Sequence, residues 1–278
     1  MKLFLRTKDF SVSGESFDLH YDAELDMLVT QPQPNDTASY YNSKEYISHT
    51  DSVASLTDRL YQWVKRYNIK KKIKIADNQI VKSKKLLDFG AGTGDFLIES
   101  KANGFEINGI EPSKIARDNA LKKGIQLFSH PSEIEGEKFD VITLWHVLEH
   151  LPNLDDQLKL FKNLLNEDGT LIIAVPNYKS FDAKHYGQHW AAYDVPRHLW
   201  HFSKTSIVRL FDKHDMEVIS VRPMLFDAFY VSLLSEKYKG SKIYMIKAFG
   251  IGLWSNIKAY FSKEYSSLIY IIRRKTSF

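Results

Sequence analysis

The sequence predicts an α/β fold in which helices cover both faces of a doubly wound, mostly parallel sheet of seven strands. Two observations lead to this prediction. From Lys85 onward, short β-prone apolar runs alternate with helical patterns, as in successive βαβ units with right-handed crossovers. The first run passes into a helix through a loop with three alternating glycines, Gly90, Gly92 and Gly94. A chain of 278 residues with 44% hydrophobic content can bury the core of such a domain.

The predicted strands are short and apolar, and helical stretches separate them. A helix is expected before the first strand, from Ser55 to about Tyr67, where apolar residues recur at helical spacing. A helical insertion at 224–262, rich in Phe, Tyr and Leu, precedes the last strand. The first 50 residues lack a clear period, although alternating pieces such as 16–21 predict small strands. We place the seven strands of the sheet at residues 85–89, 106–111, 125–128, 139–144, 170–175, 217–223 and 267–273.

Composition and charge exclude several classes of protein. The absence of cysteine excludes disulfides, thiolate catalysis and zinc bound by cysteine. The net charge of +4 is mild, and the densest basic stretch, from Lys70 to Lys85, lacks the interleaved aromatics of a nucleic-acid surface. We interpret this stretch as a solvated helix end and linker, and expect no nucleic-acid partner. Without a secretory pattern or a run of membrane-spanning length, we expect a cytoplasmic protein with no stable membrane insertion. The oligomeric state stays open.

The glycine loop is the most informative local feature. Glycines let a backbone approach a ligand closely, and the helix that follows offers unpaired N–H groups at its start. A dinucleotide-binding fingerprint would place a third glycine at position 95, where this chain has Asp95. An acid, Asp88, precedes the loop, and the next strand ends on a second acid, Glu111, 17 residues beyond Gly94.

This spacing of an acid and three glycines resembles motif I of the class I S-adenosylmethionine (SAM) methyltransferases. Residues 139–153 and 164–177 resemble motifs II and III of the same superfamily, so the resemblance covers roughly residues 85–223. It implies a seven-stranded Rossmann-like methyltransferase fold whose last strand runs antiparallel between strands five and six. The apolar stretch 267–273 suits that buried position.

The resemblance also implies SAM as the methyl donor and S-adenosylhomocysteine as the product. Glu111 is then expected to accept hydrogen bonds from both ribose hydroxyls. Trp145, at the end of the fourth strand, and Tyr46, in an aromatic segment that often closes over SAM in this superfamily, are further candidates. The alternative for the Tyr46 segment is that its aromatics pack on the domain surface. The complete set of cofactor-binding candidates is Asp88, Gly90, Gly92, Gly94, Glu111, Trp145 and Tyr46.

The flanks suggest a division of the chain. Residues 1–50 resemble the zinc-ribbon-like segment that precedes the catalytic domain in some bacterial methyltransferases, with Ser and Asp near the positions of its Cys pairs. We therefore expect a metal-free remnant as an N-terminal head, followed by a methyltransferase domain at 51–278. The insertion at 224–262 is expected to be a lid over the acceptor pocket. A dimer surface and an amphipathic piece for lipid-like substrates are the alternatives.

Residues 146–150 match the HxxEH pattern of some zinc proteases. Those enzymes carry the pattern on a long helix, whereas Pro152 follows here almost at once and a strand end precedes it. The same stretch resembles motif II of the ubiquinone-type O-methyltransferases, in which a carboxylate and a histidine help bind a divalent cation. His146 stands where an acid is often found, and Mg²⁺ prefers oxygen ligands. We therefore expect no divalent metal.

Methyl transfer from SAM requires alignment of the acceptor and, for a hydroxyl acceptor, removal of a proton. A neutral histidine is a suitable base near pH 7. The catalytic candidates are His146, His150 and His198, with His201 as a fourth possibility. The alternative for each is an inert histidine that is hydrogen-bonded to the backbone.

The segment 176–203 is longer than most connections and lies beside the expected site. Its ending resembles a large group of bacterial SAM methyltransferases. We expect this segment to border the acceptor, with Arg197 paired to Asp194 rather than bound to an anionic substrate. Four of its aromatic residues are candidates for the wall of the acceptor pocket: Trp190, Tyr193, Trp200 and Phe202.

These features predict a methyltransferase that acts on a hydroxyl of a small molecule. One alternative is a nucleotide-dependent oxidoreductase, which Asp95 and the antiparallel last strand disfavour. The other is a SAM-binding protein that lacks catalysis.

Overall fold

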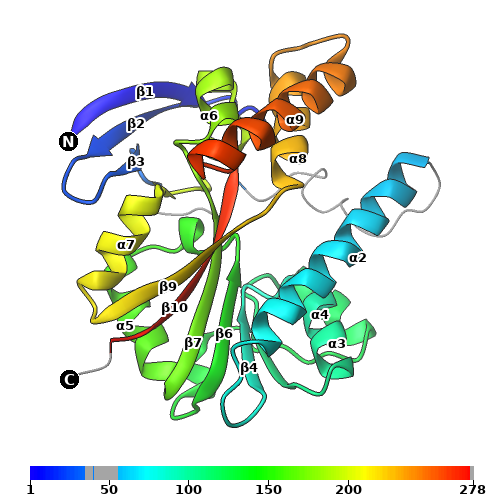
Figure 1. Cartoon of the computed structure of the whole chain (residues 1–278), viewed down its shortest axis with the longest axis vertical. Helices are drawn as coiled ribbons and strands as arrows, with labels where there is room; N and C mark the ends of the chain where they lie inside the picture. The colour runs from blue at the N-terminus through cyan, green and yellow to red at the C-terminus, as the bar shows by residue number, and fades with distance from the viewer. Residues whose placement is uncertain (35–39, 41–55, 276–278) are drawn as a thin grey trace.

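The computed structural model describes residues 1–34, 40 and 56–275, which form two sheets with helices around the larger one (Figure 1). The strands of the large sheet follow the order β5-β4-β6-β7-β10-β9. β10 pairs antiparallel with both β7 and β9, and the other pairs are parallel. This arrangement confirms the predicted fold class. The strands are β4 (Lys85–Phe89), β5 (Glu106–Ile110), β6 (Phe139–Trp145), β7 (Leu165–Pro176), β9 (Met216–Pro223) and β10 (Ser267–Arg274).

One predicted strand is reduced to a single bridge. At 125–128, only Phe128 forms a parallel bridge, with Ile110, so the described sheet has six strands rather than seven. The Phe128 N–H donates to the Gly109 carbonyl, and its own carbonyl accepts from the Glu111 N–H. Beyond the bridge, the N–H groups of Ser129 and His130 donate to the Glu133 carboxylate rather than to a strand, and a short 3₁₀ helix, η2 (Pro131–Ile134), begins.

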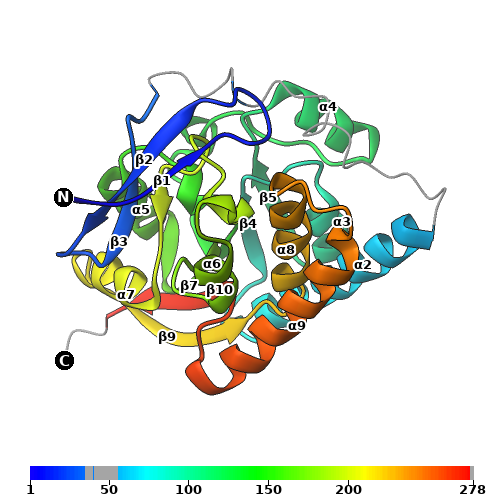
Figure 2. The same ribbon diagram turned by 90° about the horizontal axis from the view of Figure 1, so that it is seen from above.

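Helices cover both faces of the large sheet, as Figures 1 and 2 show. Alternate side chains of each central strand enter different cores: in β6, Val141 packs on one face, and Ile142 and Leu144 pack on the other. Burial on both faces explains why these strands are continuously apolar. The first core includes α2 (Leu56–Asp77), α3 (Asp95–Ala102) and α4 (Lys114–Lys122), and the second includes α5 (Leu154–Leu164) and α7 (Lys204–Asp212).

The N-terminal strands form a second, antiparallel sheet, in the order β1-β2-β3-β8. Its first three strands are β1 (Lys2–Lys8), β2 (Ser16–Asp22) and β3 (Met27–Gln31), and its fourth, β8 (Trp200–His201), comes from the long segment predicted to border the acceptor. The small strand predicted at 16–21 is therefore present. The expected boundary near residue 50 lies outside the described residues, and the division into head and catalytic domain stays a prediction.

Arg197 joins the head to the rest of the chain. Its guanidinium is 1% exposed and forms ion pairs with Asp194 at 2.6 Å and with Asp9 at 2.9 Å. It also donates to the Tyr40 carbonyl at 3.0 Å. The expected Arg197–Asp194 pair is confirmed, and the guanidinium pulls the pKa of Asp9 well below its usual range against the opposing effect of burial. Within the described residues, the Arg197 guanidinium is thus fully engaged by partners of the protein itself.

The long segment after β7 is folded rather than open. It contains α6 (Phe181–Tyr186), and the Trp190 indole N–H donates to buried Asp182 at 2.7 Å. Trp190, Tyr193 and Phe202 are 2%, 3% and 1% exposed, so their rings pack inside the protein, whereas Trp200 is half-buried. That these aromatics wall an acceptor pocket stays a prediction. Burial of these large rings stabilises the fold more than exposure to a pocket would.

The insertion before the last strand is a pair of helices, α8 (Asp227–Tyr238) and α9 (Tyr244–Ser262). The predicted helical insertion is thus present. α8 and α9 pack against each other, and the pair lies above the carboxyl-terminal end of the large sheet (Figures 1 and 2).

Replacing Arg197 with Gln should destabilise the protein by about 3–5 kcal/mol, because it leaves the Asp9 carboxylate buried without its cation. Urea unfolding followed by circular dichroism measures this loss. The matched control is Arg6→Gln, whose pair with Asp18 is 69% exposed on the arginine side and should contribute far less, because solvent screens it. Equal effects of the two variants would contradict a structural role for the buried cluster.

Candidate functional site

The glycine loop connects β4 to α3 at the carboxyl-terminal edge of the sheet. Gly90, Gly92 and Gly94 all have positive φ, at 77°, 54° and 78°. A Cβ on Gly90 would lie 2.5 Å from Val147 Cγ2, whereas a Cβ on Gly92 would meet no atom within 4 Å. Gly90 is therefore required by packing, and Gly92 leaves open space above the loop.

Glu111 lies directly after β5 and contacts this loop. Its carboxylate accepts the Gly92 N–H at 2.9 Å and the Ser113 N–H at 2.8 Å, one bond to each oxygen. The two predicted parts of the cofactor site, 19 residues apart in the chain, are therefore in direct contact. Ser113 in turn caps the N-terminus of α4, so the acid and the following helix are positioned together.

Asp88 is buried at the end of β4, below the loop. It is 2% exposed and accepts the Thr143 hydroxyl at 2.6 Å. Burial raises the pKa of its carboxyl to about 7, although the Thr143 hydrogen bond and the Lys72 ammonium oppose the rise. Burial lowers the pKa of Lys72 in turn. The buried Asp88 carboxyl and the half-buried Lys72 ammonium therefore interact at the end of β4.

Lys72 corrects the expectation that the basic stretch is solvated throughout. Its ammonium lies 4.4 Å from the centroid of the Trp145 ring. Ile69, Ile73 and Ala76 of α2 pack against the same core, and Lys72 lies on this inward helical face. The helical spacing of these apolar residues in the sequence already indicated that position 72 faces inward.

Trp145, another predicted cofactor residue, ends β6 beside the start of α3. Its ring contacts Phe96 edge-on at 5.6 Å between centroids. Trp145 therefore lies between the first helix after the glycine loop and Lys72 of α2. Tyr46 lies outside the described residues.

His146 follows β6 with φ 59° and lies between two carboxylates. Nε2 lies 3.1 Å from Asp227 Oδ2, and Nδ1 lies 3.4 Å from Glu149 Oε1. Burial opposes the charge on the ring, but these two acids outweigh it and raise the pKa of His146 to about 9. An imidazolium has no lone pair for an incoming proton. This state differs from the neutral histidine that a general base requires.

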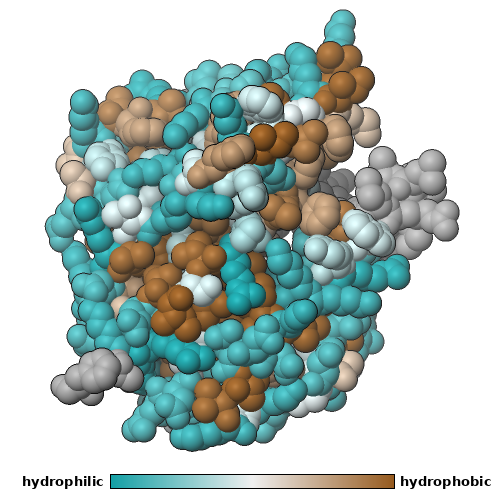
Figure 3. All heavy atoms as spheres, in the orientation of Figure 1, coloured by the Kyte–Doolittle hydropathy of each residue, from teal (hydrophilic) through white to brown (hydrophobic). Residues whose placement is uncertain are grey.

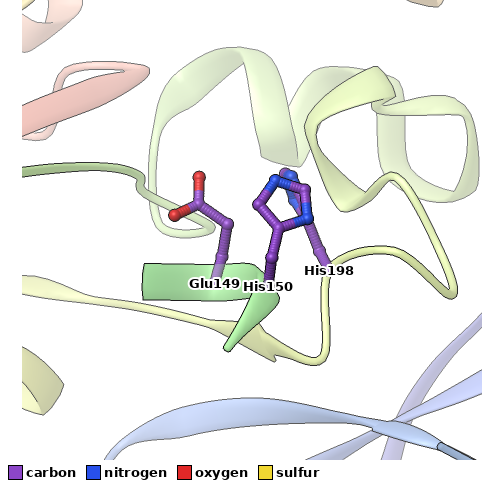
Figure 4. A group of neighbouring side chains, drawn as sticks. All are labelled: Glu149, His150 and His198. Carbon is purple, nitrogen blue, oxygen red and sulfur yellow. The ribbon is translucent and has the colours of Figure 1, made fainter. Parts of the chain in front are cut away.

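Glu149, His150 and His198 form a cluster next to His146 (Figure 4). Glu149 and His150 come from the 3₁₀ helix η3 (Leu148–His150), and His198 precedes β8. One ligand atom from each residue lies within 4.8 Å of the other two. The two imidazole rings meet edge-on at 4.5 Å between centroids. The structure thus brings together all three catalytic candidates around one acid.

Backbone carbonyls determine the tautomers of two of these histidines. His150 Nδ1 donates to the Arg197 carbonyl at 3.0 Å, and His198 Nδ1 donates to the Ala192 carbonyl at 2.9 Å. In the neutral rings the lone pair is then on Nε2. Burial lowers the pKa of His150 to about 4, so it is neutral near pH 7.

Glu149 is fully buried, and within the described part of the chain its carboxylate oxygens make no hydrogen bond. The His146 imidazolium is its nearest compensating charge. The histidines hold the pKa of Glu149 below its usual range, although burial alone would raise it. One carboxylate and two imidazole nitrogens form a donor set that suits zinc-like ions better than Mg²⁺. The expectation of no divalent metal stays a prediction.

His201 has a different role. Its Nε2–H donates to the Thr30 hydroxyl at 3.0 Å, and that hydroxyl donates to the His198 carbonyl at 2.7 Å. Burial lowers its pKa well below the usual value. His201 therefore joins β3 of the head to the segment that carries His198.

Three residues of the site were missing from the sequence-based candidates: Lys72, Glu149 and Asp227. Glu149 was noticed only as part of the HxxEH pattern, and its full burial was the missing information. Asp227 is the first residue of α8 and contacts a histidine 81 positions earlier. No local pattern indicates such a contact, because it depends on how the insertion folds back over the sheet.

A carboxyl-terminal sheet edge with a glycine-rich loop and an acid on the neighbouring strand defines a Rossmann-like ligand-binding domain. The model of the methyltransferase domain family matches residues 45–221. The chain belongs to this family, and its predicted kinship with the class I SAM-dependent methyltransferases is confirmed.

Similar curated proteins include ubiquinone biosynthesis O-methyltransferases. That of Glaesserella parasuis is 37% identical over 109 residues, which are 34% of this chain and 46% of the relative. That of Idiomarina loihiensis is 28% identical over 171 residues, which are 55% of this chain and 70% of the relative. The chain spans about half the length of the first of these relatives.

The fold is shared with magnesium protoporphyrin IX methyltransferase from Synechocystis. Its structure with bound S-adenosylhomocysteine has a TM-score of 0.56 and 13% identity, covering 85% of this chain and 97% of the other. Its SAM complex gives a TM-score of 0.52, with 12% identity and coverage of 85% and 94%. At this identity the likeness concerns the fold alone.

The paired state of His146 should make stability depend on pH. The pKa of His146 is about 9 in the folded protein and 6.5 for a histidine without these partners, as in the unfolded chain. The stabilisation is therefore complete below pH 6.5 and is lost as pH rises through 9. Because the ring is 33% exposed, we expect a loss of about 1–2 kcal/mol. Urea unfolding of the wild type and His146→Gln across pH 6–10 measures it.

The control for this measurement is Asp227→Asn, which keeps the histidine but removes one of its two acidic partners. It should move the loss of stability to lower pH. Identical pH profiles for the wild type and both variants would show that His146 is not held as an imidazolium.

Proposed function

We propose that this protein transfers a methyl group from SAM to a hydroxyl of a small molecule. The observation that carries the proposal is the contact between the glycine loop and Glu111 at the carboxyl-terminal edge of the sheet. Family membership and the SAM-bound and S-adenosylhomocysteine-bound structural neighbours support it. A cytoplasmic location and the absence of a nucleic-acid partner stay predictions. In the described chain, no helix is long and apolar enough to cross a membrane.

SAM binds in this proposal with its methionine end over the glycine loop and its ribose on Glu111. The open space at Gly92 allows the ligand to approach the backbone, and the Glu111 carboxylate has lone pairs for two hydroxyls besides its backbone donors. Lys72 supplies a cation near the loop for the methionine carboxylate. Trp145, beside Lys72, contributes an apolar wall.

The acceptor lies in this proposal beside Glu149, His150 and His198. The sulfonium already activates the methyl group, so the protein has to align the acceptor oxygen and remove its proton. His198 and His150 are the candidate bases, because an imidazole whose Nδ1–H donates to a backbone carbonyl presents Nε2 for a proton. His146 instead compensates Glu149 and joins the site to the insertion through Asp227, which supports the proposed lid.

His146 also supports catalysis without a divalent metal. In the ubiquinone-type enzymes that the sequence resembles, an acid is common at this position. Here an imidazolium already compensates the buried carboxylate of Glu149. A second cation in contact with the same carboxylate would be repelled by that charge.

Two other functions are distinguishable from this one. A SAM-binding protein without catalysis would bind SAM but release no S-adenosylhomocysteine with any acceptor. An oxidoreductase would bind a nicotinamide or flavin dinucleotide in preference to SAM. The glycine spacing and the family match disfavour the second.

Glu111→Ala should weaken SAM binding by about 2–4 kcal/mol, since it removes a charged acceptor for two ribose hydroxyls. Isothermal titration calorimetry with SAM measures this change. Glu106→Ala is the matched control, because Glu106 begins the same strand and its side chain is 71% exposed. Gly92→Val should abolish binding by filling the open space above the loop. Wild-type affinity for SAM in both Glu111→Ala and Gly92→Val would contradict the proposed cofactor site.

If His198 or His150 is the base, its replacement by Ala should lower the rate of methyl transfer by roughly 10²–10⁴ without a change in SAM affinity. Release of S-adenosylhomocysteine with phenolic, lipid-quinone and sugar acceptors provides the assay. His20→Ala, in β2 of the head sheet, is the control. Rates within about twofold of wild type for both variants would show that alignment alone suffices.

A further inference from the structure

In α9, the helix before β10, small residues are buried and large apolar residues are exposed. Four small residues face the protein and are buried: Ala248, Gly252, Ser255 and Ala259. Their spacing of four, three and four positions places them on one side of the helix. A Cβ on Gly252 would lie 2.8 Å from the ring of Phe229 in α8, so this side must be small. The small residues allow α9 to pack closely against α8.

The opposite side of α9 carries large apolar residues that are open to solvent. At 100° per residue, they lie across an arc centred opposite the small residues. A helix that packs on a protein core normally has its large apolar side chains inward, and an exposed cluster of this size indicates an interaction surface. Figure 3 shows part of this side as brown spheres over α9 at the top of the molecule. We define this outer face by Ile246 (74% exposed), Phe249 (64%), Leu253 (45%), Trp254 (47%), Ile257 (41%), Tyr260 (64%) and Phe261 (78%).

The chain segment that carries the outer face has charges of one sign, between Glu236 and Glu264. The stretch from 237 to 263 contains six lysines and no acidic residue. Two of these lysines lie over aromatic rings of the outer face: Lys258 lies 5.2 Å from the Trp254 ring centroid, and Lys263 lies 4.8 Å from that of Tyr260. Cations placed beside tryptophan and tyrosine rings on an apolar helix are typical of the interface between lipid headgroups and acyl chains.

We propose that the outer face of α9 binds the surface of an anionic lipid bilayer. The helix lies in the plane of the membrane, its apolar side chains enter the acyl boundary and its lysines contact lipid phosphates. α9 has 19 residues, and no helix of the described chain is apolar enough to span the membrane, so the association is peripheral. Charge favours this partner over a second copy of the chain, because a symmetric contact would bring two sets of lysines together.

This orientation has a consequence for the proposed site. α8 packs against α9 and also carries Asp227, which contacts His146. The membrane-facing helix is therefore one helix away from the carboxyl-terminal edge of the large sheet (Figure 2). Membrane binding itself does not depend on the proposed methyl transfer.

Vesicle flotation with the full chain tests the proposal. The protein should float with vesicles of phosphatidylcholine and phosphatidylglycerol, and much less with phosphatidylcholine alone. Phe249→Ser/Phe261→Ser and Lys247→Glu/Lys258→Glu should each lower the partition coefficient by about tenfold or more. Leu121→Ser, at a residue of α4 that is 62% exposed, is the matched control and should bind vesicles as the wild type does.

Two measurements keep the outcomes distinct. SAM titration should be unchanged in both double variants and thermal unfolding should change little, because the four side chains are exposed and none belongs to the proposed cofactor site. Analytical ultracentrifugation tests whether a second copy of the chain binds the outer face instead. No flotation of the wild type, flotation unaffected by the double variants, or a dimer that the double variants dissociate would each overturn membrane binding.

Discussion

The buried carboxylate of Glu149 is the constraint around which the site is organised. A buried charge must be paired, and removal of its partner costs several kcal/mol. Here the partner is His146, which is itself held by Asp227 of α8. The backbone carbonyl of Glu149 also accepts the Leu199 N–H at 2.8 Å. Glu149, in the short helix η3 after β6, therefore orders both the insertion and the long segment that follows β7.

The same constraint assigns different states to the neighbouring histidines. His146 lies between two acids and is charged, whereas His150 is half-buried beside another imidazole and donates to a carbonyl, so it stays neutral. Within one short stretch of chain, burial thus has opposite outcomes because the nearby charges differ. Acid–base chemistry requires one protonated and one unprotonated group in the same site, and neighbouring groups with different pKa values provide them. The cluster therefore suits proton transfer beside an aligned methyl donor.

Two further interactions hold the parts around this site. The Arg197 guanidinium pairs with Asp9 of the head and Asp194 of the long segment, so the head sheet is not an independent appendage within the described chain. Asp182 accepts hydrogen bonds from Trp190, Ser255 and Ser266, which joins α6 to α9 and to the approach of β10. These buried acids explain how a segment rich in polar residues folds compactly. They also hold α9 by its small-residue side, which leaves its large apolar residues outward.

The sequence by itself determined the strands, the glycine loop and Glu111. Each depends on a local rule: continuous apolar runs form strands buried on both faces, and alternating glycines permit the positive φ angles that the loop adopts. The contact between Gly92 and Glu111 follows from parallel strand order, which brings the carboxyl ends of β4 and β5 to one edge. The strand predicted at 125–128 was reduced to a bridge at Phe128, since the Ile125 N–H donates back to the Ala120 carbonyl of α4 rather than to β5.

Only the tertiary structure decided the charge state of His146, the inward position of Lys72 and the burial of Trp190. His146 meets Asp227 across 81 positions, and Arg197 meets Asp9 across 188, so no local window contains both partners. A pKa depends on burial and on the charges nearby, and both arise only when distant segments pack. The outer face of α9 has the same origin. Its apolar residues are visible in the sequence, but which side is buried depended on the close packing that Gly252 permits against Phe229.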